Sequence, residues 1–228
     1  MKQMPLDMGL AAGPSIDNFW AGPNQAALEH LRLWLGAGGG SQSRSPVPTY
    51  FWGPNGSGKT HLLKAVREGL REQGGRVGWL DATLDAPPDF DETWTAVLMD
   101  DVHLYTASQQ QRAFNWFVHA QTCQRPVVAA GELAPADLRL RDDLRTRLGW
   151  GHVFGLQVLT EPERRGVLRR AADARGIFLG DEVMDYMLTR FSRDLGSLME
   201  LLDLLDGYSL QTQRAITIPL IKSMLENH

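Results

Sequence analysis

The sequence is poor in the features that mark several classes of protein. A single cysteine in 228 residues, Cys123, excludes an internal disulfide framework and a zinc site built from thiolates. No uncharged apolar run approaches the ~20 residues that a membrane-spanning helix needs. The first ten residues contain Asp7 and no long apolar stretch, so they do not resemble a secretory signal. We therefore expect a cytoplasmic protein, in a reducing compartment, with no membrane partner.

An excess of charge of one sign is also missing. The 23 Lys and Arg residues against 27 Asp and Glu residues give a formal net charge of -4. This balance argues against a general nucleic-acid coat and against a polybasic membrane binder. Hydrophobic residues make up 43% of the chain, so a sizeable core is available. At roughly 150 residues per domain, the length indicates one or two domains.

Hydrophobic patterning divides the chain into three parts. Residues 1–18 are punctuated by Pro and Gly and lack periodicity, and we interpret them as a mobile arm. Residues 19–158 alternate between short apolar runs and helical patterns, which predicts an α/β domain with a parallel sheet covered on both faces. Residues 159–228 hold no strand pattern and begin with a capping box at Thr160–Glu163, which predicts a small all-helical domain.

The elements can be placed more closely by residue number. The predicted strands lie at residues 50–52, 77–80, 96–99, 127–130 and 153–156. The predicted helices lie at residues 24–35, 59–73, 107–123, 161–175, 181–192 and 195–211, with a last one from Thr217. Asn24 is of a residue type that can cap the first helix.

A glycine-rich loop between a predicted strand and a predicted helix carries the strongest chemical signal. The run Gly53-Pro-Asn-Gly-Ser-Gly-Lys-Thr60 fits the P-loop pattern, in which backbone N–H groups at a helix N-terminus wrap a polyphosphate. Lys59 would reach the outer phosphates, and the Thr60 hydroxyl would ligate Mg²⁺. The loop residues expected to contact the nucleotide are Gly53, Pro54, Asn55, Gly56, Ser57, Gly58, Lys59 and Thr60.

Two aspartates follow the apolar run at residues 96–99. A P-loop needs a second acidic group at the end of another strand, and Asp100 stands where it would hold Mg²⁺ directly or through water. Asp101 would orient the attacking water. The two motifs together predict a nucleotide site with Mg²⁺.

Beyond these motifs, the chain resembles the AAA+ ATPases, and within them the DnaA group, over nearly its whole length. The run Asn18-Phe-Trp-x-Gly-x-Asn24 resembles the segment that lines the adenine pocket in that group. The resemblance implies that Phe19, Trp20 and Asn24 bind the nucleotide. The paired aspartates are also DnaA-like.

A second segment of the DnaA type lies near the end of the predicted α/β domain. Asp143–Gly151 resembles the part of DnaA that carries an arginine finger, which implies that Arg147 acts in trans. In that role its guanidinium would reach the γ-phosphate bound by a neighbouring subunit.

Within the DnaA group, the chain resembles the Hda family of regulatory inactivators of DnaA. DnaA continues beyond its helical lid into a helix-turn-helix domain that reads origin DNA, whereas this sequence stops at His228. We therefore expect DNA to be reached mainly through partners.

The arm resembles a clamp-docking motif. Gln3-Met-Pro-Leu-Asp-Met8 is similar to the short segment with which Hda proteins dock into the sliding clamp of DNA polymerase. The resemblance implies clamp contacts from Gln3, Met4, Leu6 and Met8. Methionine stands at positions 4 and 8, where leucine is more usual.

Two positions depart from the family pattern. Gly196 aligns where AAA+ lids usually carry a sensor-2 arginine, and Ala129–Glu132 lacks the usual small polar residue of sensor 1. Both departures imply a nucleotide-holding regulator with a weak intrinsic ATPase at most. ADP and ATP both stay open as the resting nucleotide.

The leading hypothesis is a negative regulator of replication initiation that binds adenine nucleotide and the clamp. It would stimulate hydrolysis of DnaA-bound ATP through Arg147 in trans. A helicase-loader-type AAA+ ATPase and a clamp-bound, non-catalytic scaffold are the alternatives. Assembly into a homodimer or a higher oligomer is compatible with each of them.

Overall fold

The computed structural model describes residues 13–36, 44–191 and 195–226. They separate into two compact units, residues 13–158 and the described residues from Leu159 onward. Within the described part of the chain, no helix combines the length and the apolar character needed to cross a bilayer. Each unit has its own core and is considered by itself.

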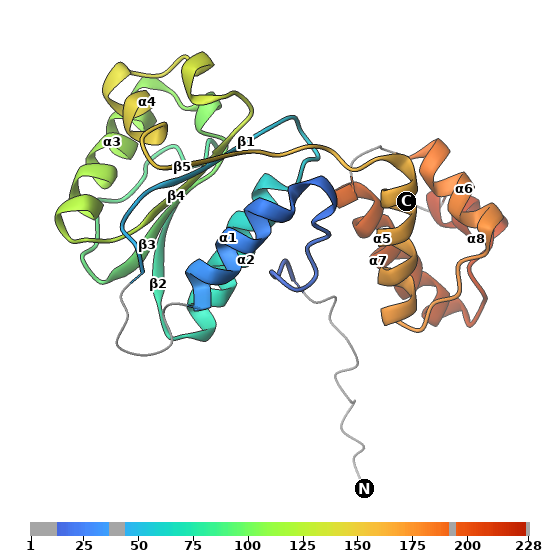
Figure 1. Ribbon diagram of the computed structural model, residues 1–228. Coiled ribbons are helices and arrows are strands. Elements are labelled where there is room, and N and C mark those ends of the chain that lie inside the picture. The colour runs from blue at the N-terminus through green and yellow to red at the C-terminus, as the bar shows by residue number, and fades with distance from the viewer. Residues whose placement is uncertain (1–12, 37–43, 192–194, 227–228) are drawn as a thin grey trace, which may run out of the picture. The chain divides into compact units, whose positions relative to one another are not determined.

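The first unit is built on a five-stranded sheet (Figure 1). Its strands are β1 (Thr49–Trp52), β2 (Arg76–Leu80), β3 (Trp94–Met99), β4 (Val127–Gly131) and β5 (His152–Gly155). They lie in the order β2-β3-β4-β1-β5, and all their pairings are parallel. The strand that leads into the glycine-rich loop, β1, therefore lies inside the sheet, and the carboxyl ends of its neighbours open onto the same edge.

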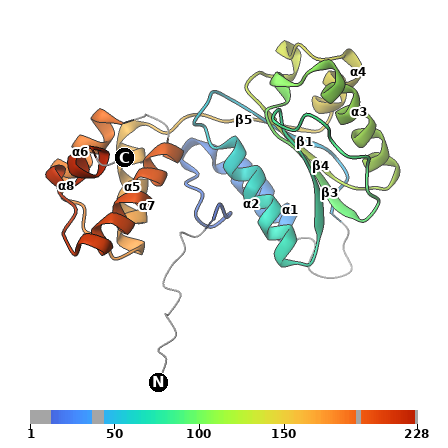
Figure 2. The same cartoon turned by 180° about the vertical axis from the view of Figure 1, so that it is seen from behind.

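Helices cover both faces of this sheet (Figures 1 and 2). They are α1 (Gln25–Gly36), α2 (Lys59–Glu72), α3 (Ala107–Thr122) and α4 (Asp142–Leu148). Successive strand residues point to opposite faces. Phe51 accordingly packs with the cluster under α1 and α2, whereas Tyr50 packs with the cluster under α3 and α4. Because both rings are fully buried, β1 is fixed from both sides.

The second unit consists of helices only. They are α5 (Glu161–Ala174), α6 (Asp181–Arg190), α7 (Leu195–Thr212) and α8 (Ile218–Glu226). The capping box expected at its start is confirmed, because the Glu163 carboxylate accepts both the N–H and the hydroxyl of Thr160, each at 2.7 Å. A separate core of leucine, isoleucine and methionine side chains holds the helices together.

The predicted fold class, a parallel-sheet α/β core followed by a helical domain, is confirmed. Two local expectations were incomplete or wrong. Helix α4 was not expected as an element, because charged residues dominate it and only Leu144 and Leu148 are buried. Asn24 does not cap α1 with its side chain: it closes a 3-10 turn at Gly22–Asn24, and its amide instead pairs with the backbone of Gln157.

Candidate functional site

The glycine-rich loop leaves the carboxyl end of β1 and enters α2 in the interior of the sheet. Gly53 approaches the outgoing end of β5 so closely that a Cβ atom at this position would lie 2.3 Å from the carbonyl oxygen of Leu156. Any other side chain would therefore push the loop away from the sheet. Close approach to the neighbouring backbone explains why the first loop residue is glycine.

The opposite end of the loop carries a second glycine with a different constraint. Gly58 has φ of +94°, and a Cβ atom there would lie 2.7 Å from Cε2 of Phe19. The Phe19 ring therefore lies directly against the N-terminus of α2. This contact brings together two segments that the sequence assigned to the nucleotide for separate reasons.

Inside the loop, one polar side chain lacks a hydrogen-bond partner and another bonds only to the loop itself. The Ser57 hydroxyl is buried and makes no hydrogen bond. The Lys59 ammonium is folded back onto the loop, where it donates to the carbonyl oxygens of Gly53 at 2.8 Å and Pro54 at 3.0 Å. An unpaired buried hydroxyl is costly in a folded protein, so the loop interior fits a ligand that accepts hydrogen bonds.

The electrostatics around Lys59 are those of a buried cation facing carboxylates. Burial lowers the pKa of the Lys59 ammonium, and the negative charges of Asp101, Asp100 and Glu132 act in the opposite direction. The ammonium therefore lies close enough to all three acids to be influenced by them. The charged groups of the P-loop and of the carboxyl ends of β3 and β4 therefore influence one another.

Asp100 and Thr60 meet at the entrance of α2. Asp100 is buried, and burial raises the pKa of its carboxyl, against which a hydrogen bond with Thr60 acts. The backbone N–H of Asp101 also donates to the Asp100 carboxylate at 3.0 Å. The two residues expected to ligate Mg²⁺ are therefore hydrogen-bonded neighbours, although they lie on different elements.

The acid at the end of β4 was not assigned a role from the sequence. The N–H of Glu132 donates to Nδ1 of His103 at 3.2 Å, and its carboxylate lies 3.4 Å from Nε2 of the same ring. Glu132 belongs to the segment that lacks the small polar residue of sensor 1. Its position one residue past a strand adjacent to β1 was the signal that could have placed it near Lys59.

The residues expected to contact the adenine differ in how deeply they are buried. Phe19 and Trp20 are both half-buried. Asn24 is buried, and both ends of its amide are engaged: Nδ2 donates to the carbonyl of Gln157 at 2.9 Å, and Oδ1 accepts the N–H of Gln157 at 2.8 Å. Asn24 therefore fastens the segment before α1 to the chain that leaves β5.

Arg147 lies on α4, on the face of the sheet opposite α2. Its Nη1 donates to Oε1 of Gln121 at 2.6 Å, and its guanidinium carbon lies 5.4 Å from the ring centre of Phe114 and 5.8 Å from that of Phe117. Arg147 is half-buried, and it lines a surface hollow together with Gln121 and the exposed Trp150. Sequence patterns had not indicated Gln121 and Phe114 as its neighbours.

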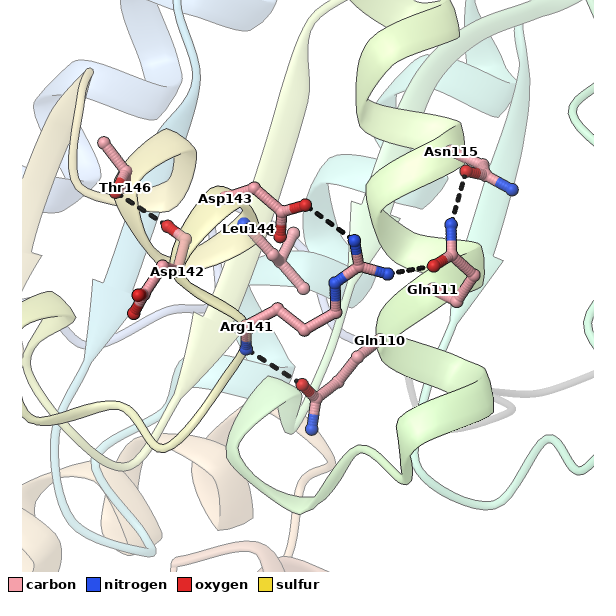
Figure 3. A network of polar contacts seen from close by, with 8 residues as sticks. All are labelled: Gln110, Gln111, Asn115, Arg141, Asp142, Asp143, Leu144 and Thr146. Carbon is pink, nitrogen blue, oxygen red and sulfur yellow. Dashed lines mark hydrogen bonds and ion pairs between the residues drawn. The ribbon is translucent and has the colours of Figure 1, made fainter.

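The arginines next to Arg147 differ from it in their partners. Arg141 pairs with Asp143 at 2.7 Å and also bonds Gln111 (Figure 3), and Arg145 pairs with Asp142 at 2.8 Å. Among the described residues, no ion pair joins Arg147 to a carboxylate, and its hydrogen-bond partner is a neutral amide. Of these three arginines, Arg147 is therefore the one whose charge the described part of the chain leaves uncompensated.

Two comparisons identify the family. Residues 161–225 match the family described as "Hda, lid domain". An uncharacterized protein of Haemophilus influenzae is 32% identical over 236 aligned residues, with 98% of each chain covered. The chain belongs to the Hda family of DnaA-related AAA+ proteins.

Solved structures share the fold of this Hda-family chain at low identity. Domain III of the replication initiation protein DnaA from Thermotoga maritima matches with a TM-score of 0.74 and 20% identity, covering 96% of this chain and 98% of that chain. AMPPCP-bound DnaA from Aquifex aeolicus matches with a TM-score of 0.65 and 22% identity, covering 85% and 65%. The RuvB Holliday junction branch migration motor of Thermotoga maritima matches with a TM-score of 0.63 and 16% identity, covering 93% and 71%. The core and lid of the Hda-family protein thus have the AAA+ architecture.

The clamp-docking residues and the sensor-2 position of the Hda-family chain remain predictions from the sequence. Gln3, Met4, Leu6 and Met8 lie outside the described residues. Gly196 is exposed in the first turn of α7. Its role at the sensor-2 position stays a prediction from the sequence.

Proposed function

We propose that this DnaA-related regulator binds an adenine nucleotide at the glycine-rich loop. The Ser57 hydroxyl is the observation that carries the proposal, because it is buried within the loop and has no hydrogen-bond partner there. Lys59 would exchange its two loop carbonyls for phosphate oxygens, which form stronger, charge-assisted hydrogen bonds. Phe19 and Trp20 would cover the base, beside Gly58.

Mg²⁺ would be held by Thr60 and Asp100. A divalent magnesium ion in such sites is bound by one or two protein oxygens together with phosphate oxygens. The chain is consistent with that pattern, because the described residues contain no group of three or more His, Cys, Asp or Glu that could cage a metal alone. Asp101, next in the chain, would orient water near the phosphate.

Arg147 would act on the nucleotide of a different protein. Its helix packs on the face of the sheet opposite α2, and its uncompensated charge suits an anionic target. In this proposal the target is ATP bound by DnaA, and the guanidinium stabilises the charge that develops on the γ-phosphate. The result is DnaA-ADP and a block on re-initiation.

The clamp would bring the two proteins together on DNA. The proposed contacts come from Gln3, Met4, Leu6 and Met8, a glutamine followed by spaced apolar side chains. Such short segments bind surface pockets with modest affinity because they lose entropy when they become ordered. Coupling to the clamp would restrict the reaction to DNA that is being replicated.

The proposal is tested by mixing the protein with ATP-loaded DnaA and with the clamp loaded on DNA, and by measuring the fraction of DnaA-ADP over time. The parent protein should accelerate hydrolysis. R147A and R147K should lose this effect, in R147A by on the order of 10³-fold, since lysine cannot reproduce the guanidinium fork. R145A is the matched control, because Arg145 lies on the same helix but is paired with Asp142. Retained stimulation by R147A would overturn the trans mechanism.

The same mixture distinguishes the alternatives. A Q3A/L6A variant should no longer be retained on the clamp, and normal retention would overturn the docking part of the proposal. A clamp-bound scaffold would bind DnaA and the clamp but leave the DnaA-ATP fraction unchanged. A helicase loader would instead bind the replicative helicase and ignore the clamp.

A further inference from the structure

The connection between α5 and α6 exposes an aromatic side chain on a well-anchored backbone. Phe178 is 87% exposed, while its neighbours Ile177 and Leu179 pack into the helical core. The N–H of Ile177 donates to the carbonyl of Ala172 at 2.9 Å and fixes the start of the segment. The side chains that flank Phe178 therefore hold it outward: Leu179 is buried, and Ile177 is half-buried against the same core.

A second exposed apolar side chain lines the same hollow as Phe178. Leu210, near the end of α7, is 72% exposed, and both side chains line a hollow of about 660 Å³. Its wall also includes Val183 and Ile216, which belong to the core of the unit. Exposing large apolar side chains around a concave surface is unfavourable in water, and such surfaces commonly mark binding sites.

The lining of this hollow carries a net negative charge once the ion pairs within the unit are taken into account. Arg175 is paired with Asp203 at 2.5 Å, and Asp181 is paired with Arg169 at 2.5 Å. Glu182 and Asp206 also line the hollow, and among the described residues neither has an ion-pair partner. The hollow therefore offers apolar side chains together with two uncompensated carboxylates.

We propose that this hollow is a docking site for a peptide segment of a partner protein that carries apolar anchor side chains flanked by lysine or arginine. The anchors would enter between Phe178 and Leu210, and the basic groups would pair with Glu182 and Asp206. This is the groove mode of peptide recognition, in which an apolar face supplies the affinity and charges supply the register. The site lies wholly within residues 175–217 and does not depend on the nucleotide chemistry proposed above.

The same charges disfavour a second copy of this chain as the occupant. In a symmetric dimer formed through this surface, the same patch would face itself. Glu182 and Asp206 of one copy would then lie near the same acids of the other, which is unfavourable for uncompensated charges. A partner of opposite charge is the better complement.

The test uses the full-length protein and a fluorescent synthetic peptide with leucine on one helical face and lysine on the other, with binding followed by anisotropy. F178S and L210S should each weaken binding by about tenfold, as expected when an anchor contact is lost. L204S is the matched control, because Leu204 is an exposed leucine of α7 that does not line the hollow. Equal weakening by L204S, or no weakening by F178S and L210S, would overturn the proposal.

The charge requirement is tested separately. E182Q/D206N should weaken binding severalfold and reduce its dependence on salt, whereas E200Q, an exposed acid of α7 outside the hollow, should not. A peptide with glutamate in place of lysine should bind more weakly than the lysine peptide. Equal binding of both peptides would overturn the proposed basic partner, as would self-association of the free protein that F178S abolishes.

Discussion

The Phe19 ring lies against Gly58, so that a Cβ atom on the glycine would come within 2.7 Å of the ring. One of these residues precedes α1 and the other opens α2. The contact joins the segment that resembles an adenine pocket to the loop that resembles a phosphate cradle. It also means that the glycine is required for two independent reasons, its φ of +94° and the absence of space above it.

Gly58→Ala is therefore expected to lower stability more than the same substitution at a glycine whose only constraint is its positive φ. Gly74 has φ of +76° and no atom within 4 Å of the position that a Cβ would take, so G74A should cost only the roughly 1–2 kcal/mol of left-handed backbone. G58A should cost more and should abolish nucleotide binding. Thermal unfolding and calorimetric titration with ADP measure the two effects. If the ring is the obstacle, F19L should partly restore the stability of G58A.

Asp100→Asn should separate stability from metal binding. Burial raises the pKa of this carboxyl above its ordinary 3.8, so the native state holds the proton more tightly than the unfolded chain. Stability is then lost as pH rises through that pKa, and the charged form is destabilising at neutral pH. D100N should raise the midpoint of thermal unfolding without nucleotide by ~2–4 °C, as about 1 kcal/mol does for a protein of this size. D100N should also weaken nucleotide binding in the presence of Mg²⁺. If Mg²⁺ strengthens nucleotide binding by D100N as much as by the parent protein, Asp100 is not a ligand of the metal.

Gln121→Glu should change stability and activity in opposite directions. The substitution keeps the shape of the side chain that bonds Arg147 but adds a carboxylate, which would compensate the guanidinium charge. Folding should gain up to ~1 kcal/mol, while stimulation of DnaA-bound ATP hydrolysis should fall. Q111E is the control, since Gln111 bonds Arg141 instead. Loss of stimulation in Q111E to the same degree would show that charge near α4, rather than Arg147 itself, matters.

His30 should make the first unit sensitive to mild acid. Its ring is partly buried, and its centre lies 4.6 Å from that of His152. Burial lowers the pKa of His30 below 6.5, and the nearby His152 acts in the same direction. The unfolded chain therefore binds the proton more readily, and stability falls as pH drops below about 6.5. The midpoint of thermal unfolding should be measured at about pH 7.5 and at about pH 5.5, on either side of the histidine range. Between these two values the midpoint should fall less in H30Q than in the parent protein. An identical decrease would exclude His30 as a source of the acid sensitivity.

Much of the fold was predictable from local patterns. The short apolar runs became β1 to β5, and the P-loop came at the strand-to-helix junction that its chemistry requires. The start of the helical unit followed from the Thr160–Glu163 capping box, a signal contained within one turn of helix. Such features depend on residues close together in the chain, so the sequence exhibits them directly.

Several contacts between residues that are distant in the sequence were not predictable. Asn24 is of a type that caps helices, yet it pairs with Gln157, and nothing near residue 24 indicates that partner. Glu132 comes close to Lys59 only because β4 lies next to β1 in the sheet. The position of Phe178 outside the core likewise depends on which of its neighbours the helices bury.

By itself, the sequence predicted most of the elements, the glycine-rich loop and the paired aspartates, because each of these rests on residue types at short spacing. The choice of Arg147 came instead from the resemblance of Asp143–Gly151 to DnaA. Only the tertiary structure decided which side chains of the described residues lack partners. It left the Ser57 hydroxyl unpaired, compensated Arg141 and Arg145 but not Arg147, and left Glu182 and Asp206 uncompensated. The physical reason is that pairing and burial depend on how strands and helices far apart in the chain pack together, which fixes the balance of charge and hydrogen bonds at each site.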